Sequence, residues 1–118
     1  MAATAVTPVA IELNGVTMSS GDAAAVTFTT GNTTDGNAVD FSKADNKTVI
    51  LFNNTAQSAG KATIKAGDFI QGVKDIEVDV PSGVSACMLD SGYFENKTKK
   101  VLVVPSAATV TVGAVTLP

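Results

Sequence analysis

The amino-acid sequence predicts an all-β domain, an antiparallel β-sandwich of about 7–9 short strands. Thr and Val, which fit pleated and half-buried strands, are abundant, and Asn, Asp and Gly, which favour turns, separate the apolar segments. No segment of useful length has the period of an amphipathic helix. At 118 residues the chain has the size of one domain, so we expect a single sandwich over residues 1–118, either immunoglobulin-like or jelly-roll-like.

The strongest strand patterns lie after residue 47. Two continuous apolar runs, residues 48–53 and 101–104, predict strands in the centre of two packed sheets. No connection is long enough to hold a crossover helix, so we expect antiparallel pairing throughout. Further strands, separated by turn residues, are predicted over residues 61–65, 76–80, 84–89 and 108–117. In the last of these, the residues expected to face the core are Val110, Val112, Ala114 and Leu117.

The N-terminal part of the chain gives weaker signals. Residues 9–13 alternate and lead into Asn14-Gly15, a dipeptide typical of two-residue hairpin turns. Residues 26–28 predict one more short strand. Residues 29–37 are predicted to form a loop, and residues 1–9, rich in Ala and Thr, are a candidate flexible arm.

The composition argues against catalysis and against nucleic-acid binding. The chain has no His, Arg or Trp. It therefore lacks the side chain best suited to proton transfer near neutral pH, which is also the commonest metal ligand, and it lacks the bidentate phosphate-binding guanidinium. Its formal net charge is -3 and its pI about 4.6, which opposes contact with a phosphate backbone. We predict a non-enzymatic protein that uses no cofactor and no metal.

Cysteine content and the start of the chain bear on the compartment. The single cysteine, Cys87, cannot form an intramolecular disulfide, which argues against a disulfide-stapled secreted domain. Residues 1–9 have neither the basic nor the apolar region of a signal peptide, and no stretch approaches the ~20 apolar residues that cross a bilayer. We expect synthesis in a cytosol and no membrane partner.

Two features invite a chemical interpretation. Asp75, Glu77 and Asp79 alternate along a predicted strand, where they could bind a hard cation or act as a glycosidase-like pair. The favoured interpretation is the solvent face of an amphipathic strand, with Ile76, Val78 and Val80 facing the core. Cys87 has no His to activate it, so we expect a buried or half-buried packing residue.

Three other clusters are interpreted structurally. Asp35-Gly36-Asn37 does not meet the spacing of a calcium loop and is predicted to be a turn. The lysines at 97, 99 and 100 lack an interleaved aromatic residue and are predicted to lie in a solvated turn. Phe69 and Ile70 lie in a predicted loop, either as an exposed contact or, in the favoured interpretation, as a plug of one end of the sandwich.

The order of these segments resembles that of small head-decoration proteins of tailed bacteriophages. In that family an Asn-Gly turn, an Asp-x-(Arg/Lys)-Thr strand with an Asn-rich turn, a Thr-Ile strand, a Val-Pro-x-Gly stop and a final Val/Thr/Ala strand follow one another. The resemblance covers nearly the whole chain. Its matching segments here are residues 14–15, 45–51, 53–55, 62–64, 76–83, 93–96 and 108–117.

The resemblance implies a virion structural protein that binds the outer surface of a phage capsid, contacts the major capsid protein and stabilises the shell. It also implies a location on the capsid surface after synthesis in the host bacterial cytoplasm. The protein is expected to form a homo-oligomer, such as a trimer, and residues 1–9 are expected to become ordered when they contact the capsid. The family has no catalytic motif, so no site residue is transferred from it.

Two alternative functions remain open from the sequence. One is a tail or fibre accessory β-domain of a virion. The other is a carbohydrate- or surface-binding β-sandwich module, which is disfavoured because such modules present Trp or Tyr for sugar stacking and this chain has no Trp and one Tyr.

Overall fold

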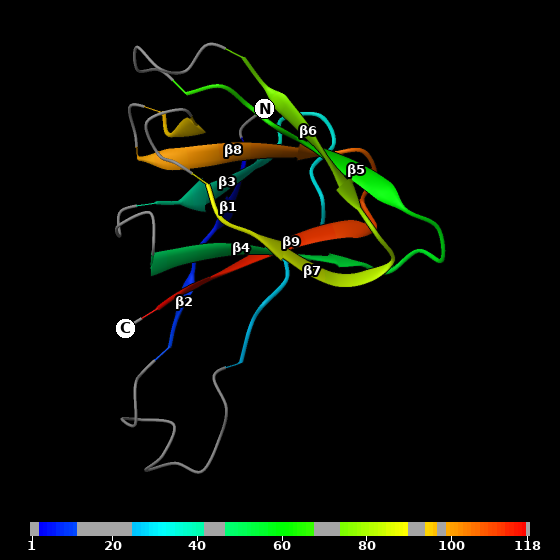
Figure 1. The fold of residues 1–118 in the computed structure, drawn as a ribbon, viewed down its shortest axis with the longest axis horizontal. Helices are drawn as coiled ribbons and strands as arrows, with labels where there is room; N and C mark the ends of the chain where they lie inside the picture. The colour runs from blue at the N-terminus through cyan, green and yellow to red at the C-terminus, as the bar shows by residue number, and fades with distance from the viewer. Residues whose placement is uncertain are drawn as a thin grey trace.

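The computed structural model of the chain is a sandwich of two β-sheets, here called sheet A and sheet B (Figure 1). The residues that the structure describes are 3–11, 25–41, 47–67, 74–89, 94–96 and 99–117. In Figure 1 the main strands of sheet A form the upper layer and those of sheet B the lower layer. The all-β sandwich predicted from the sequence is therefore confirmed.

Nine strands make up the two sheets within the described ranges. The neighbours in sheet A are, in order, β1 (Thr4–Val6), β3 (Asn37–Asp40), β8 (Lys100–Pro105), β5 (Gly60–Ile64) and β6 (Ile76–Val80). The neighbours in sheet B are, in order, β2 (Val9–Ala10), β9 (Val110–Thr116), β4 (Thr48–Asn54) and β7 (Gly83–Cys87). The two continuous apolar runs, now β4 and β8, lie inside their sheets, as predicted.

The antiparallel pairs are nested within one another along the chain. β5 pairs with β6, β4 with β7 and β3 with β8, and a bridge between Thr29 and Val112 extends the series outwards. The chain therefore behaves as one long hairpin that folds over, and the β4–β9 and β5–β8 pairs close it into a sandwich. This is the connectivity of a jelly roll, one of the two arrangements expected.

The core lies between the sheets and follows the period of two along each strand. In β4 the residues at 48, 50, 52 and 54 are buried and those between them are half-buried. Branched aliphatic residues fill most of the volume, and Phe41 and Phe52 are the largest side chains. The most deeply buried apolar residues are Val39, Ile50, Phe52, Ala62, Ile64, Val80, Val101, Val103, Val110, Val112 and Ala114.

The prediction of antiparallel pairing throughout is wrong at two sheet edges. β1 pairs in parallel with β3, and β2 in parallel with β9. These partners are far apart in sequence, so no tight turn dictates their relative direction. Most of the candidate arm, residues 4–9, together with Ala10 instead supplies one edge strand to each sheet, and the buried Val6 joins the core.

Other local predictions are also corrected. Within residues 26–29 only Thr29 pairs, through its bridge to Val112, and the predicted loop over 29–37 ends in a strand because β3 begins at Asn37. Leu117 is 37% exposed. The alternation of β9 gives that core position to Thr116.

Candidate interaction surface

The two sheets differ in charge. The four strands of sheet B contain no Asp, Glu or Lys on either face. The strands of sheet A contain five charged residues, Asp40, Lys61, Glu77, Asp79 and Lys100. Interfaces between proteins are depleted of charge at their centres, so the outer face of sheet B is the candidate surface for contact with another protein.

The outer face of sheet B is largely apolar. Val49 and Leu51 of β4 are half-buried there, and Val84 of β7 is 67% exposed. The register places Ala86 of β7 beside Leu51. On the neighbouring strand, Gly113 lies beneath the Phe28 ring, because a Cβ at this position would come within 3.1 Å of the ring. We call this surface, formed by Val49, Leu51, Val84 and Ala86, the neutral face.

β7 has the reverse of the usual polarity for an amphipathic strand. Its inward positions are Ser85 and Cys87, which lie opposite Phe52 and Ile50. Its outward positions are Val84 and Ala86, and the next residue of this row, Met88, is 50% exposed. The sequence predicts the strand but not which of its two faces points to the core. The signal was the placement of Ser and Cys between larger apolar residues.

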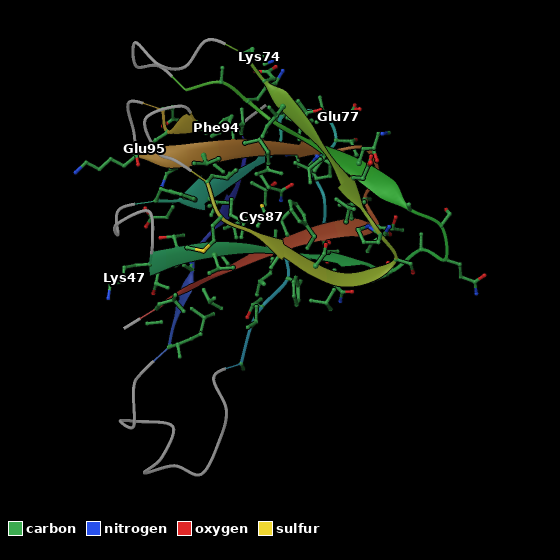
Figure 2. The ribbon with its side chains drawn as sticks, in the orientation of Figure 1. Lys47, Lys74, Glu77, Cys87, Phe94 and Glu95 are labelled. Atoms are coloured by element: carbon green, nitrogen blue, oxygen red, sulfur yellow. The ribbon has the colours of Figure 1, made fainter. Side chains whose placement is uncertain are left out.

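The three alternating carboxylates lie on the outer face of sheet A, where Lys61 of β5 and Lys65, which follows this strand, pair with them. Lys61 Nζ lies 2.7 Å from Asp79 Oδ1 and 3.4 Å from Glu77 Oε1, and Lys65 Nζ lies 3.2 Å from Asp75 Oδ2. The hydrogen bond to Asp79 is the main cause that raises the pKa of Lys61. Figure 2 shows Glu77 on β6. The predicted solvent face is confirmed, and the carboxylates face ammonium groups.

The Asp75 carboxylate accepts a main-chain hydrogen bond in addition to its ion pair with Lys65. The Ala66 N–H donates a 2.7 Å hydrogen bond to Asp75 Oδ1, and this bond, followed by that from Lys65, lowers the pKa of Asp75 from 3.8. The folded state therefore favours the carboxylate. Its contribution to stability is present above the unfolded pKa and is lost as the pH falls through the folded value.

We expect the Asp75 side-chain carboxyl to titrate below pH 3.8 in an NMR experiment that follows its chemical shift. Lys65→Ala should remove part of the shift and leave the rest, because the Ala66 N–H remains. A midpoint at or above 3.8 in the wild-type protein would contradict this arrangement.

Cys87 points inward from β7, half-buried against the core (Figure 2). This confirms the packing role predicted for it. Burial raises the pKa of the thiol from 9.0 to about 11, because the thiolate would lose its hydration. The reactive thiolate is therefore scarce at neutral pH.

We expect Cys87 to react slowly with a disulfide reagent such as DTNB. With a pKa of about 11, only about one thiol in a thousand is ionised at pH 8. The modification rate should keep rising to pH 10, whereas the urea-unfolded chain should react quickly at pH 8. A folded-state rate at pH 8 equal to that of the unfolded chain would refute the assignment.

Asp35 and Gly36 belong to a turn, as predicted, whereas Asn37 is already the first residue of β3. Gly36 has a φ of 83°, and Asn32 Oδ1 accepts hydrogen bonds from the N–H groups of Thr34 and Asp35. The buried Asn37 side chain accepts from the Asn32 N–H at 2.9 Å. Asp35 Oδ2 is buried without a partner in the described part of the chain, but a single carboxylate oxygen does not make a cation site.

Of the three lysines predicted to lie in a solvated turn, Lys99 does so, whereas Lys100 is the first residue of β8. Asn96 organises this turn, since its main-chain carbonyl accepts from the Lys99 N–H and its side chain accepts from the Lys100 N–H. Lys99 is exposed and has a φ of 62°, typical of a tight turn. Lys97 and the Phe69-Ile70 pair lie outside the described residues.

Metal centres and membrane-spanning helices are the remaining classes of site. No group of three or more His, Cys, Asp or Glu side chains is placed to hold a metal ion within the described ranges. These ranges also contain no helix that is long and apolar enough to cross a membrane.

Comparison of the chain with protein families, with curated proteins and with solved structures finds no match. A functional assignment therefore depends on the surface of the molecule and on the order of its sequence segments.

Proposed function

We propose that this chain is a non-enzymatic structural protein of a phage virion, which binds the outer surface of the capsid and stabilises it. The observation that carries the proposal is the contrast between the sheets. Sheet B presents the neutral face, while the charges on β5 and β6 pair with one another. Such a surface suits burial against another protein and offers no group for proton transfer.

The sequence resemblance supplies the identity of the proposed partner. The segments that resemble head-decoration proteins include β4, β6 and the turn after it, and β9. A protein that binds the assembled shell but not free subunits stabilises the assembly by mass action. A small sandwich can do so by burying the neutral face against neighbouring capsid subunits.

The proposal is tested by mixing the purified protein with empty shells of the phage that encodes it and measuring co-sedimentation. The wild-type protein should pellet with the shells and saturate. Leu51→Lys, which places a charge in the neutral face, should weaken binding at least about tenfold, because the ammonium group would have to be desolvated.

Thr63→Lys is the matched control, since Thr63 is a half-buried residue on the outer face of sheet A. It should bind the shells like the wild-type protein. Absence of wild-type binding would overturn the proposed function. Equal loss of binding in both variants would instead argue against the neutral face as the contact.

A further inference from the structure

Four strands form the edges of the two sheets, β1 and β6 in sheet A and β2 and β7 in sheet B. An edge strand offers unpaired N–H and C=O groups to another strand unless it is short, charged or followed by proline. β1 and β2 are three and two residues long. β6 carries Glu77 and Asp79 and is followed by Pro81. Each of these three edges therefore has a feature that discourages pairing.

β7 has none of these features. Its five residues include no charge and no proline, and the uncharged sequence continues through Met88 and Leu89. A Cβ added at Gly83 would meet no atom within 4 Å, so there is open space at the start of the strand. Within the described ranges, β4 is the only strand paired with β7.

We infer that β7 is a self-association edge, which pairs antiparallel with β7 of a second copy of this chain about a twofold axis. When two copies of one strand pair antiparallel, each residue lies opposite a residue of the identical strand in the other copy. Any charge on the strand can then face a like charge, which is destabilising. Because residues 83–89 carry no charge, every register of this pairing avoids repulsion. The same arrangement at β6 would oppose carboxylates to one another.

A second copy suits this edge better than an unrelated strand. β7 has no charged side chain with which to select a foreign sequence, and its hydroxyl-bearing residue, Ser85, faces inward opposite Phe52. The partner that fits this edge is therefore an uncharged extended strand whose outward-facing residues are apolar. The chain itself contains such a strand, in Val84, Ala86 and the following Met88.

The pairing would bury the two large apolar side chains most exposed in the described residues, Val84 and Met88. It would also continue sheet B of one copy into sheet B of the other, so that the two neutral faces form one surface. The twofold arrangement is closed, which limits assembly to two copies at this edge. This inference concerns the free protein and does not depend on capsid binding.

Sedimentation velocity of the purified full chain over a wide concentration range tests the inference. The wild-type protein should form dimers in the micromolar range. Val84→Lys should raise the dimer dissociation constant at least about tenfold, because it brings ammonium groups to a shared edge. Ala86→Lys, on the same exposed row, should have the same effect and serves if the first variant is poorly folded.

Ala5→Lys is the control, because Ala5 is exposed on β1, an edge of the other sheet. It should leave the dissociation constant unchanged, and circular dichroism should show that all variants remain folded. A wild-type protein that stays monomeric, or that forms trimers, would overturn the inference. So would dimers whose affinity is the same in the wild-type protein and in the two β7 variants.

Discussion

Phe52→Ala is expected to lower the free energy of unfolding by about 3–5 kcal/mol. Phe52 is the largest of the fully buried side chains and lies on the central strand of sheet B. Its removal leaves a cavity between the sheets, which the paired strands on both sides of β4 cannot close by moving together. Urea denaturation followed by circular dichroism measures the loss, and a marginally stable domain would be largely unfolded.

Leu51→Ala is the matched control for this prediction. Leu51 neighbours Phe52 on the same strand but lies on the outer face, half-buried. Its truncation should cost less than half as much, since less apolar area returns to water. A loss at Leu51 equal to or greater than that at Phe52 would show that the assignment of faces on β4 is wrong.

Asn54→Ala is expected to cost about 2–3 kcal/mol of stability, the second largest effect. Asn54 is 2% exposed, and its side-chain NH₂ donates to the main-chain oxygens of Ser58 and Val80 at 3.0 and 3.2 Å. Its Oδ1 accepts from the Ala56 N–H. The substitution removes the donor that Asn54 supplies to the Val80 main-chain oxygen and loosens the connection from β4 to β5 and the end of β6.

Asn53→Ala tests whether the loss of stability expected for Asn54→Ala comes from the burial of the side chain rather than from the residue type. Asn53 precedes Asn54 but points to the outer face, and the bond that its main-chain oxygen accepts from Thr111 Oγ1 survives the change. Its unfolding free energy should change by under about 1 kcal/mol. Equal losses in the two variants, measured by urea denaturation, would contradict the buried role of Asn54.

The strands that the sequence predicted well are those with a local signal. Ile76, Val78 and Val80 alternate with carboxylates, so the register of β6 follows from a period of two without knowledge of its neighbours. The continuous apolar character of β4 and β8 likewise placed them inside the sheets. Turn residues located the chain reversal at Asp35 and Gly36.

The missed strands lack such a signal. β3 begins with Asn37, a residue typical of turns, and its burial is possible only because Asn32 and Thr30, several residues away, satisfy its side chain. β1 depends on a partner distant in sequence, so propensity alone leaves residues 4–6 without a structure. Part of β2 was predicted, because the alternating residues 9–13 begin at Val9, whereas the predicted Asn14-Gly15 turn lies outside the described residues.

The candidate surface could not be predicted from the sequence either, because it also depends on which distant segments pair. The absence of charge from residues 48–54, 83–87 and 110–116 is visible in the sequence, but their membership of one sheet is a property of the nested topology. Without that topology, nothing in the sequence distinguishes Val84 from the apolar residues that point to the core. The lack of charge on sheet B therefore becomes apparent only from the folded structure, in which these strands lie side by side.

Cryo-electron microscopy of virions from the phage that encodes this chain most directly tests the proposed capsid function. The proposal predicts density for the jelly-roll sandwich on the outer surface of the head, with sheet B turned towards the shell. Density on the tail or fibres, or no such density on the head, would contradict it.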